Sequence, residues 1–434
     1  MNWAAVVLFA SFGALMVVGV PIAFSIGIAA SLTFLLFMSF DQTIFIVAQQ
    51  MASGLDSFTL LAIPFFILAG NIMNRGGIAL RLIEFAKVLG GRLPGSLAHC
   101  NVIANMMFGS ISGSAVASAA AVGGVMAPLQ RKEGYDPAYS AAVNIASSPT
   151  GLLIPPSTTL IVYSLITGGT SISALFVAGY LPGALLGLGL MLVAGMIAKK
   201  RGYPVSPRPA WDEVRHRTLD AILPLGLVLV IMGGIIGGVF TATEASAAAV
   251  VYSLILALFW YREIGLRDLP KILMESAVTT TIVLLMIGTS IAMSRAMAYG
   301  DIPFALSDYL LMLSDNPLVI LLVINLALLV IGTFMDMTPA LLIFTPIFLP
   351  VVNDLGMDPV HFGIMMTFNL SIGICTPPVG SALFIGCSVG QVPISRVIKP
   401  LLPFYLVMIG LLLLVTFVPE ISLALPQWLL GYGN

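Results

Sequence analysis

Two short clusters of glycine and oxygen-bearing side chains interrupt otherwise apolar segments of the chain. The first is Gly-Ser-Ile-Ser-Gly-Ser at 109–114, and the second is Gly-Thr-Phe-Met-Asp-Met-Thr-Pro at 332–339. Glycine permits non-helical backbone, and hydroxyl and carboxylate oxygens are ligands that hard cations accept. Backbone carbonyls freed at such a break can bind a dehydrated Na⁺, while the N-terminus of the following helix favours an anion. The two clusters therefore predict sites for a cation and for an anionic solute.

Two longer apolar segments carry a second pair of interruptions. The first segment is broken at 147–151 (Ser-Ser-Pro-Thr-Gly) and at 155–158 (Pro-Pro-Ser-Thr). Its counterpart is broken at 369–373 (Asn-Leu-Ser-Ile-Gly) and at 375–380 (Cys-Thr-Pro-Pro-Val-Gly). Consecutive prolines remove amide donors and clash with the preceding turn, so each segment should form a broken helix. Interrupted apolar segments at corresponding positions of two halves are typical of transporter binding sites.

The same residues also have structural interpretations. Serine, glycine and alanine pack membrane helices closely, so any single serine within 109–121 can serve packing rather than binding. Asp336 differs, because a carboxylate at the tip of a predicted mid-membrane hairpin is costly. We favour a cation-site or gate role for Asp336 over a local cap of the following helix. Thr241 and Glu244 have the spacing of a capping box, which makes a structural role for Glu244 the expectation.

An internal duplication relates the two sets of breaks. The loop at 131–137 recurs at 353–359, 222 positions later, and the two Pro-Pro pairs keep that offset. The first loop carries Arg131 and Lys132, whereas its counterpart has only acidic charges. Because cytoplasmic loops of membrane proteins are enriched in basic residues, the difference predicts opposite sides of the bilayer and hence inverted repeats.

Composition predicts a polytopic all-α membrane protein. Hydrophobic residues make up 59% of the 434 residues and charged residues only 9%, and 137–198 contains no charged residue. The net charge of −1 argues against nucleic acid as a partner. The three cysteines, at 100, 375 and 387, lie in apolar segments and are expected in the core. The sequence has neither a Walker A motif nor a His-Glu-x-x-His motif, which argues against an ATPase and a zinc enzyme.

The expected organisation is two repeats joined by a cytoplasmic linker. Two apolar stretches would each form two arms of roughly 14 to 16 residues, too short to cross a bilayer, and are interpreted as re-entrant hairpins. The other hydrophobic runs predict ten spans, near 3–19, 22–40, 58–74, 138–166, 174–198, 219–240, 243–260, 272–294, 360–388 and 400–418. Residues 1–20 are interpreted as a retained first helix.

In these terms the first repeat covers 1–198 and the second covers 219–434, with the linker at 199–218. The first repeat comprises scaffold helices (1–74), an arm (75–92), a hairpin (96–129), a broken helix (138–166) and a helix (174–198). The second comprises scaffold helices (219–294), an arm (302–313), a hairpin (317–350), a broken helix (360–388) and a helix (400–418).

The distribution of basic residues supports this layout. With the N-terminus outside and ten crossings, 17 of the 18 Lys and Arg residues fall on the inner side, and Arg295 is the exception. The opposite orientation would place nearly all of them outside, against the bias of membrane proteins. If either hairpin crossed fully, the downstream cations would change sides, so the count also favours re-entrance.

Four motifs give the chain a family resemblance. They are Gly-Ser-Ile-Ser-Gly-Ser-Ala at 109–115, Pro-Pro-Ser at 155–157, Gly-Val-Phe-Thr-Ala-Thr-Glu-Ala at 238–245 and Asp-Pro-Val-His-Phe-Gly at 358–363. With them the chain resembles, over nearly its whole length, the large membrane subunit of tripartite ATP-independent periplasmic (TRAP) transporters. The resemblance implies an elevator-type fold related to divalent anion/Na⁺ symporters, in the inner membrane of a bacterium. It also implies a small four-span membrane partner, expected as a separate polypeptide, and a periplasmic substrate-binding protein.

The resemblance also implies where ions and solute would bind. Two Na⁺ sites are expected where the hairpin tips meet the broken helices, with the solute, a carboxylate such as a sialic acid or C4-dicarboxylate, between them. The first Na⁺ site would use Ser110, Ser112, Gly113, Ser114, Ser147, Ser148 and Gly151. The second would use Gly332, Thr333, Asp336, Thr338, Gly373 and Thr376. The solute would contact Ser112, Ser114, Pro149, Thr150, Thr338 and Thr376.

The leading hypothesis is therefore Na⁺-driven uptake of an organic carboxylate, not an enzymatic reaction. A self-sufficient anion carrier or exporter of the same fold is the main alternative, and a noncatalytic membrane scaffold is the third. Uptake by this polypeptide alone would favour the carrier. Unchanged transport after Asp336→Ala and Ser112→Ala would favour the scaffold.

Overall fold

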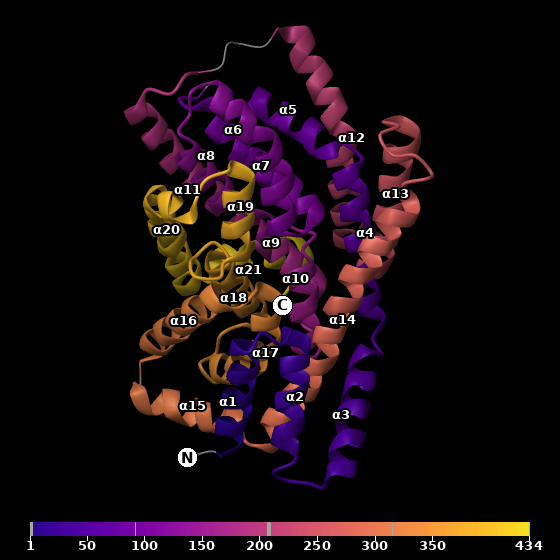
Figure 1. Ribbon diagram of the computed structural model, residues 1–434, viewed down its shortest axis with the longest axis vertical. Coiled ribbons are helices and arrows are strands. Elements are labelled where there is room, and N and C mark those ends of the chain that lie inside the picture. The colour runs from indigo at the N-terminus through magenta and orange to yellow at the C-terminus, as the bar shows by residue number, and fades with distance from the viewer. Residues whose placement is uncertain (1–2, 92, 206–209, 315, 434) are drawn as a thin grey trace.

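The computed structural model describes residues 3–91, 93–205, 210–314 and 316–433, and every regular element in these ranges is a helix (Figure 1). The prediction of an all-α membrane protein is confirmed. Within the expected arm and linker, Arg92 and residues 206–209 lie outside the described ranges. Large apolar surfaces remain on the outside of the helices, as expected where lipid rather than water surrounds them.

The scaffold helices of each half pack against the other half. Helix α2 (Ile22–Phe34) packs along α14 (Leu269–Tyr299), and α13 (Ala242–Leu254) packs along α4 (Ala62–Arg75). The rest of the scaffold comprises α1 (Trp3–Val17), α3 (Phe40–Leu55), the 3₁₀ turn Phe58–Leu61, α12 (Trp211–Ile236) and the π-helical turn Ile255–Trp260.

The first spans differ from the prediction. Helices α1 and α2 have 15 and 13 residues, fewer than the ~20 that cross a bilayer. Gly19, with φ of +86°, and Pro21 end the first helix early, and α3 is a separate helix that the sequence analysis did not predict. Among the described helices eight are long and apolar enough to cross a membrane, or nine with one bent pair. They include Pro317–Phe334 and Met337–Asp354, which the prediction assigned to a hairpin, and they leave out the predicted spans near 3–19, 22–40 and 360–388. Helices α1 and α2 are both too short. Removing two crossings together leaves the downstream residues on the same side of the membrane.

The arms and hairpins lie close to their predicted positions. The arms are α5 (Ile78–Gly90) and α15 (Ile302–Leu313). The hairpins are α6–α7 (Ser96–Ser112 and Ala115–Lys132) and α16–α17 (Pro317–Phe334 and Met337–Asp354). Their helices contain 17 or 18 residues, longer than predicted, and both helices of the second hairpin reach the length of a span. Helix length alone therefore does not establish re-entrance, which stays a prediction.

Both long apolar segments are broken. The first forms α8 (Pro137–Ser147), the short turn α9 (Thr150–Leu153) and α10 (Thr158–Ile166), with a bend of 49° before α10. The second forms α18 (Pro359–Gly373) and α19 (Ser381–Gly390). Helices α11 (Ile172–Arg201), α20 (Ile394–Phe417) and α21 (Glu420–Leu430) complete the chain. Helix α21 was not predicted, and α12 begins at Trp211, seven residues before the predicted end of the linker at 218.

The duplicated loop ends and begins equivalent helices. Helix α7 ends at Lys132 and α17 at Asp354, the same 222-residue offset, and α8 and α18 both begin with proline. Asp136 accepts a hydrogen bond from the amide of Ala138 at 3.0 Å, and Asp358 accepts one from the amide of Val360 at 2.7 Å. An aspartate at the cap followed by proline starts a helix with its free amides satisfied, so the duplicated pair starts each broken helix in the same way.

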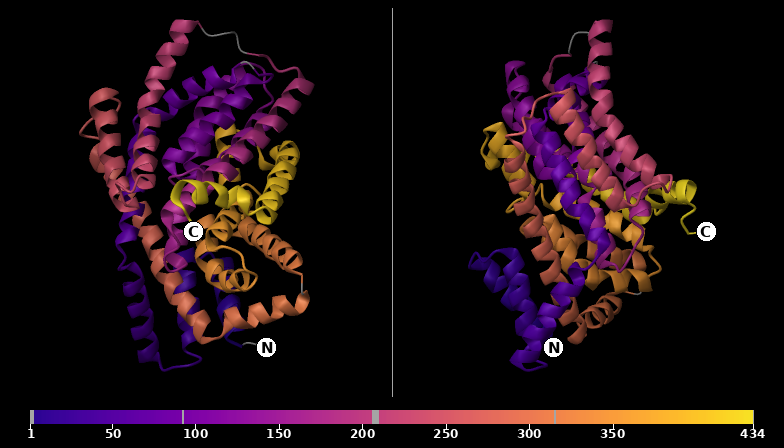
Figure 2. Two further views of the ribbon diagram at one scale, coloured as in Figure 1. Left: turned by 180° about the vertical axis from the view of Figure 1, so that it is seen from behind. Right: turned by 90° about the vertical axis from the view of Figure 1, so that its right-hand side faces the viewer.

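Matching segments lie at opposite ends of the molecule. Arm α5 lies at the top of Figure 1 and arm α15 at the bottom, and both views of Figure 2 agree. The first hairpin lies in the upper half and the second in the lower half. This placement supports the prediction of inverted repeats.

Candidate functional site

The two hairpin tips and the two helix breaks meet at one cavity of about 320 Å³. Helices α4 and α14 form the opposite wall with mainly apolar side chains. The lining residues are Ile67, Ser112, Gly113, Ser114, Ala115, Val116, Leu152, Thr158, Thr159, Thr279, Ile282, Val283, Met286, Asp336, Met337, Thr338, Ile374 and Ser381. Asp336 is the one charged side chain among these described residues.

Four helices begin at the wall of this cavity. Ser114 and Asp336 are the N-cap residues of α7 and α17, Thr158 is the first residue of α10, and Ser381 is the first residue of α19. The first amides of a helix lack intrahelical partners, and the helix dipole places partial positive charge there. The convergence of four such ends makes the cavity favourable for an anion, although no Lys or Arg is among the described lining residues.

The first tip is compact and uncharged. Gly113 ends α6 with φ of +61°, a left-handed conformation that glycine adopts readily. The Ser114 hydroxyl accepts a hydrogen bond from the amide of Ala117 at 3.3 Å and so caps α7. The Thr158 hydroxyl donates to the carbonyl of Gly113 at 3.4 Å, which links the tip to the start of α10.

The second tip carries a carboxylate that does not cap its own helix. Asp336 is exposed, makes no side-chain hydrogen bond to the first amides of α17, and accepts one from the Ser381 hydroxyl at 3.0 Å. The amide of Val379 donates to the carbonyl of Thr333 at 3.1 Å and ties the tip to the second break. The local-cap interpretation of Asp336 thus lacks the contact that it requires.

Glycines bring the backbones of tips and breaks into contact. A Cβ added to Gly151 would lie 2.2 Å from the Cα of Gly109, and one added to Gly373 would lie 2.5 Å from the Cα of Gly332. Both distances are far below van der Waals contact, so α6 crosses α9, and α16 crosses α18, with no room for a side chain. Gly151, Gly332 and Gly373, which the sequence analysis assigned to ion sites, therefore have this packing role as well.

Buried asparagines bind each hairpin to its broken helix. The Asn105 amide donates to Asn144 at 3.1 Å and to the Ser147 hydroxyl at 2.7 Å, and its oxygen accepts from Ser118 at 2.6 Å. In the second half, the Asn369 amide donates to the side-chain and backbone oxygens of Asn325, both at 2.9 Å. Unpaired amides are costly in an apolar interior, so these contacts hold the tips at a defined position.

The predicted site residues divide into three groups. Ser112, Gly113, Ser114, Asp336 and Thr338 line the cavity. Ser110, Ser147, Ser148, Pro149, Thr150 and Gly151 are buried behind the first tip. Gly332, Thr333 and Gly373 form the contact between the second tip and the break, and Thr376 lies within the break. The hydroxyls of Ser110, Ser147, Ser148, Thr333 and Thr376 donate to backbone carbonyls three or four residues earlier in the chain.

Several cavity residues were not predicted. Thr159 and Ser381 each lie in the first turn after a proline-containing break, so the dipole argument could have found them. Thr279 and the apolar residues of α14 and α4 carry no local signal. They line the cavity because the scaffold passes beside the tips, which no sequence pattern within those helices reveals.

Comparison with known proteins places this geometry in a family. A model of the DctM component of tripartite ATP-independent periplasmic transporters matches residues 9–421. The chain is 57% identical over 421 residues to the uncharacterized protein YgiK of Salmonella typhimurium, with 97% of each chain covered. It is 41% identical to the sialic acid TRAP transporter large permease protein SiaM of Vibrio cholerae, over 97% of this chain and 98% of that one.

A third relative, the C4-dicarboxylate TRAP transporter large permease protein DctM of Pseudomonas aeruginosa, is 40% identical over 93% of this chain and 94% of its own. Among solved structures, the YdaH transporter of Alcanivorax borkumensis superposes with a TM-score of 0.63 at 14% identity, covering 89% of this chain and 90% of that one. The YdaH likeness concerns the fold alone. The family match and the relatives together identify the chain as a multi-pass membrane protein, not an enzyme, that belongs to the DctM component, or large permease, family of TRAP transporters.

Proposed function

We propose that this chain forms the membrane pathway of a Na⁺-driven uptake system for an organic carboxylate. The observation that carries the proposal is the cavity at which four helix N-termini converge. It attracts an anion through backbone amides and hydroxyls, and among the described lining residues no cationic side chain would hold the solute permanently. The relatives named for sialic acid and C4-dicarboxylates share this class of solute.

Charge balance supports the coupling to Na⁺. Asp336 and a carboxylate solute would place like charges in one cavity, and in a partly desolvated site their repulsion is large. A Na⁺ ion near Asp336 would offset this repulsion, since carboxylate, hydroxyl and carbonyl oxygens are suitable ligands for it. Asp336, the Ser381 hydroxyl and the carbonyls of the second tip are the groups present for that purpose.

The ion would also favour solute binding by ordering the second hairpin tip. Filling the space beside Asp336 would join the second tip to α19, and an ordered tip completes one wall of the solute cavity. Solute binding and ion binding would then stabilise the same arrangement, which is the thermodynamic requirement for coupled transport.

The remaining parts of the system follow from the tripartite family description. We include a small four-helix membrane subunit and a periplasmic binding protein that delivers the solute. The chain would lie in the bacterial inner membrane with its N-terminus in the periplasm. The ion pairs Arg75–Glu275, Arg81–Glu263 and Arg217–Glu84 would then lie on the cytoplasmic side, as the cation count requires.

The test is uptake into proteoliposomes that contain this chain with its small subunit, using labelled carboxylates presented with and without the companion binding protein. We expect uptake only with an inward Na⁺ gradient and with the binding protein present. Uptake that persists when K⁺ replaces Na⁺ would refute the coupling. Uptake by this chain alone would instead establish the self-sufficient carrier.

A further inference from the structure

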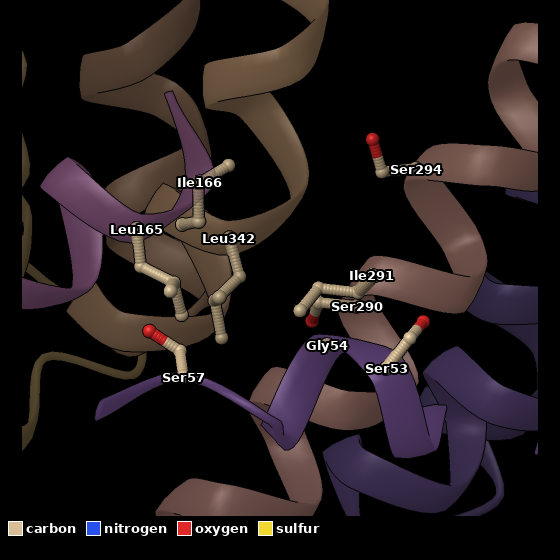
Figure 3. Close-up of a pocket in the computed structure, with 9 residues that line it drawn as sticks. All are labelled: Ser53, Gly54, Ser57, Leu165, Ile166, Ser290, Ile291, Ser294 and Leu342. Atoms are coloured by element: carbon tan, nitrogen blue, oxygen red, sulfur yellow. The ribbon is translucent and has the colours of Figure 1, made fainter. Parts of the chain in front are cut away.

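A second cavity of about 260 Å³ lies between scaffold helices α3 and α14 and the ends of α10 and α17 (Figure 3). Leu165, Ile166 and Leu342 lie on one side of it, and Ser290, Ile291 and Ser294 on the other. Ser53, Gly54 and Ser57 complete the lining. Four of its nine lining residues are thus serines, and none is charged.

The lining of this cavity continues the lining of the central one along α14 and α17. Thr279, Val283, Met286, Ser290 and Ser294 follow one another at spacings of three or four residues, so they share one face of α14. The first three line the central cavity and the last two line the second. Helix α17 behaves in the same way, with Thr338 in the central cavity and Leu342, one turn later, in the second.

The hydroxyl of Ser290 indicates a ligand. Its side chain is 2% exposed and its oxygen has no hydrogen-bond partner. The neighbouring Thr289 hydroxyl donates to the carbonyl of Leu285 at 3.0 Å, as is usual for such residues in helices. Ser290 does not use the carbonyl of Met286 in this manner. A buried hydroxyl without a partner is unfavourable, so the site is suited to a group that accepts or donates a hydrogen bond there.

The burial of the lining serines increases from one end of the cavity, its mouth, to the other end, its base. Ser53 is exposed, Ser57 and Ser294 are half-buried, and Ser290 is buried. Gly54 keeps α3 close to α14, because a Cβ on it would lie 2.3 Å from Ile291. The mouth therefore lies between the two scaffold helices on the side toward the C-terminal end of α14, the helix that arm α15 follows in the chain.

We propose that this serine-lined cavity is a second, weaker solute site, which small organic acids occupy between the central cavity and the end of the molecule that carries α15. The inference rests on the proposed transport function and adds an entry site to it. Serine hydroxyls hydrogen-bond the carboxylate and hydroxyl oxygens of such a solute. No cationic side chain is among the described lining residues, which keeps binding weak and release fast.

The direct test is labelling of Ser290→Cys in the assembled transporter with 2-sulfonatoethyl methanethiosulfonate, an organic anion that does not cross membranes. The matched control is Thr289→Cys, which has the adjacent position on α14, is also buried, and lines neither cavity. The native cysteines at 100, 375 and 387 are buried, so the unsubstituted chain gives the background. We expect Ser290→Cys to react at least tenfold faster than Thr289→Cys, and more slowly as unreactive ethanesulfonate or succinate is added.

Equal rates at the two positions would overturn the proposal. Labelling that neither ethanesulfonate nor succinate slows would also overturn it, because the cavity would then pass reagent without binding acids. If Ser290→Cys does not fold, Ser294→Cys carries the same test from the opposite end of the same wall. The labelling needs no Na⁺ gradient, so its result is separate from that of the uptake experiment.

A transport measurement adds a second criterion. Ser290→Leu would fill the cavity and should reduce the maximal uptake rate at least fivefold while leaving solute binding at the central cavity unchanged. Ser290→Ala keeps the space and should alter uptake less than Ser290→Leu. Equal effects of the two variants would contradict occupation of the cavity by solute.

Discussion

The two hairpin tips have the same backbone plan and different chemistry. Each tip crosses a broken helix at a glycine–glycine contact, and each is held by buried asparagines. The first tip offers only hydroxyls and backbone and uses Ser114 to cap α7. The second offers the Asp336 carboxylate, which leaves α17 without a side-chain cap and accepts from Ser381 instead.

The comparison shows that the backbone contacts that position the tips are independent of the charge that a tip presents to the cavity. Positions where backbone meets backbone have remained equivalent after duplication, because any side chain there would push the helices apart. Positions facing the cavity were free to diverge. Asp336, the one charged side chain among the described lining residues, therefore makes the second tip the better cation ligand, although the two tips pack in the same way.

The strongest test of equal packing is alanine at the crossing glycines. Gly151→Ala and Gly373→Ala should each lower stability by about 3 kcal/mol, because the new methyl overlaps the backbone of Gly109 or Gly332. Thermal unfolding in detergent with a fluorescent reporter measures the loss. Gly124→Ala on α7 is the control, since nothing lies within 4 Å of its added Cβ. A loss for only one of the two crossing glycines would break the equivalence.

The asparagine networks should differ in strength. Asn105→Ala would leave polar groups of Asn144, Ser147 and Ser118 without their partner and should cost about 2 kcal/mol. Asn325→Ala removes the side-chain hydrogen bonds to Asn369 and Thr416 but keeps the backbone carbonyl that also accepts from Asn369, so it should cost about 1 kcal/mol. The same unfolding assay compares them. A larger loss for Asn325→Ala would show that the second tip is the more firmly held.

Charge at the second tip should control the response to Na⁺. Asp336→Asn keeps the shape of the side chain, and we expect the Na⁺ concentration for half-maximal uptake to rise about tenfold, or about 1.4 kcal/mol. Asp354→Asn, an exposed acid at the other end of α17, is the matched control. If both variants titrate like the unchanged chain, Asp336 does not belong to an ion site.

The smallest effect is expected from the caps. Ser114→Ala removes the hydrogen bond to the Ala117 amide and should destabilise the chain by about 1 kcal/mol. Asp336→Asn should cost little stability, because its carboxylate caps nothing. Amide hydrogen exchange at the first turns of α7 and α17 measures the effect of each substitution on its own helix. Faster exchange at α17 after Asp336→Asn would restore the cap interpretation of that residue.

Local chemistry made much of this arrangement predictable. Glycine, proline and Asp-Pro pairs mark where helices start and stop, so both arms, both hairpins and both broken helices lie close to their predicted ranges. Hydropathy alone overestimated α1 and α2, because apolar residues continue beyond their ends at Val17 and Phe34. The wall formed by α14 could not be predicted, since Thr279 joins the cavity through packing between distant segments.

The exchange of scaffold partners between halves has a consequence for biogenesis. Helix α2 reaches its main neighbour, α14, only after more than two hundred further residues have been synthesised, and α4 likewise waits for α13. The nascent first half must therefore remain in the bilayer with unpaired faces until the ribosome has nearly finished the scaffold of the second. Two separately expressed halves should each be degraded when made alone and should be rescued when made together.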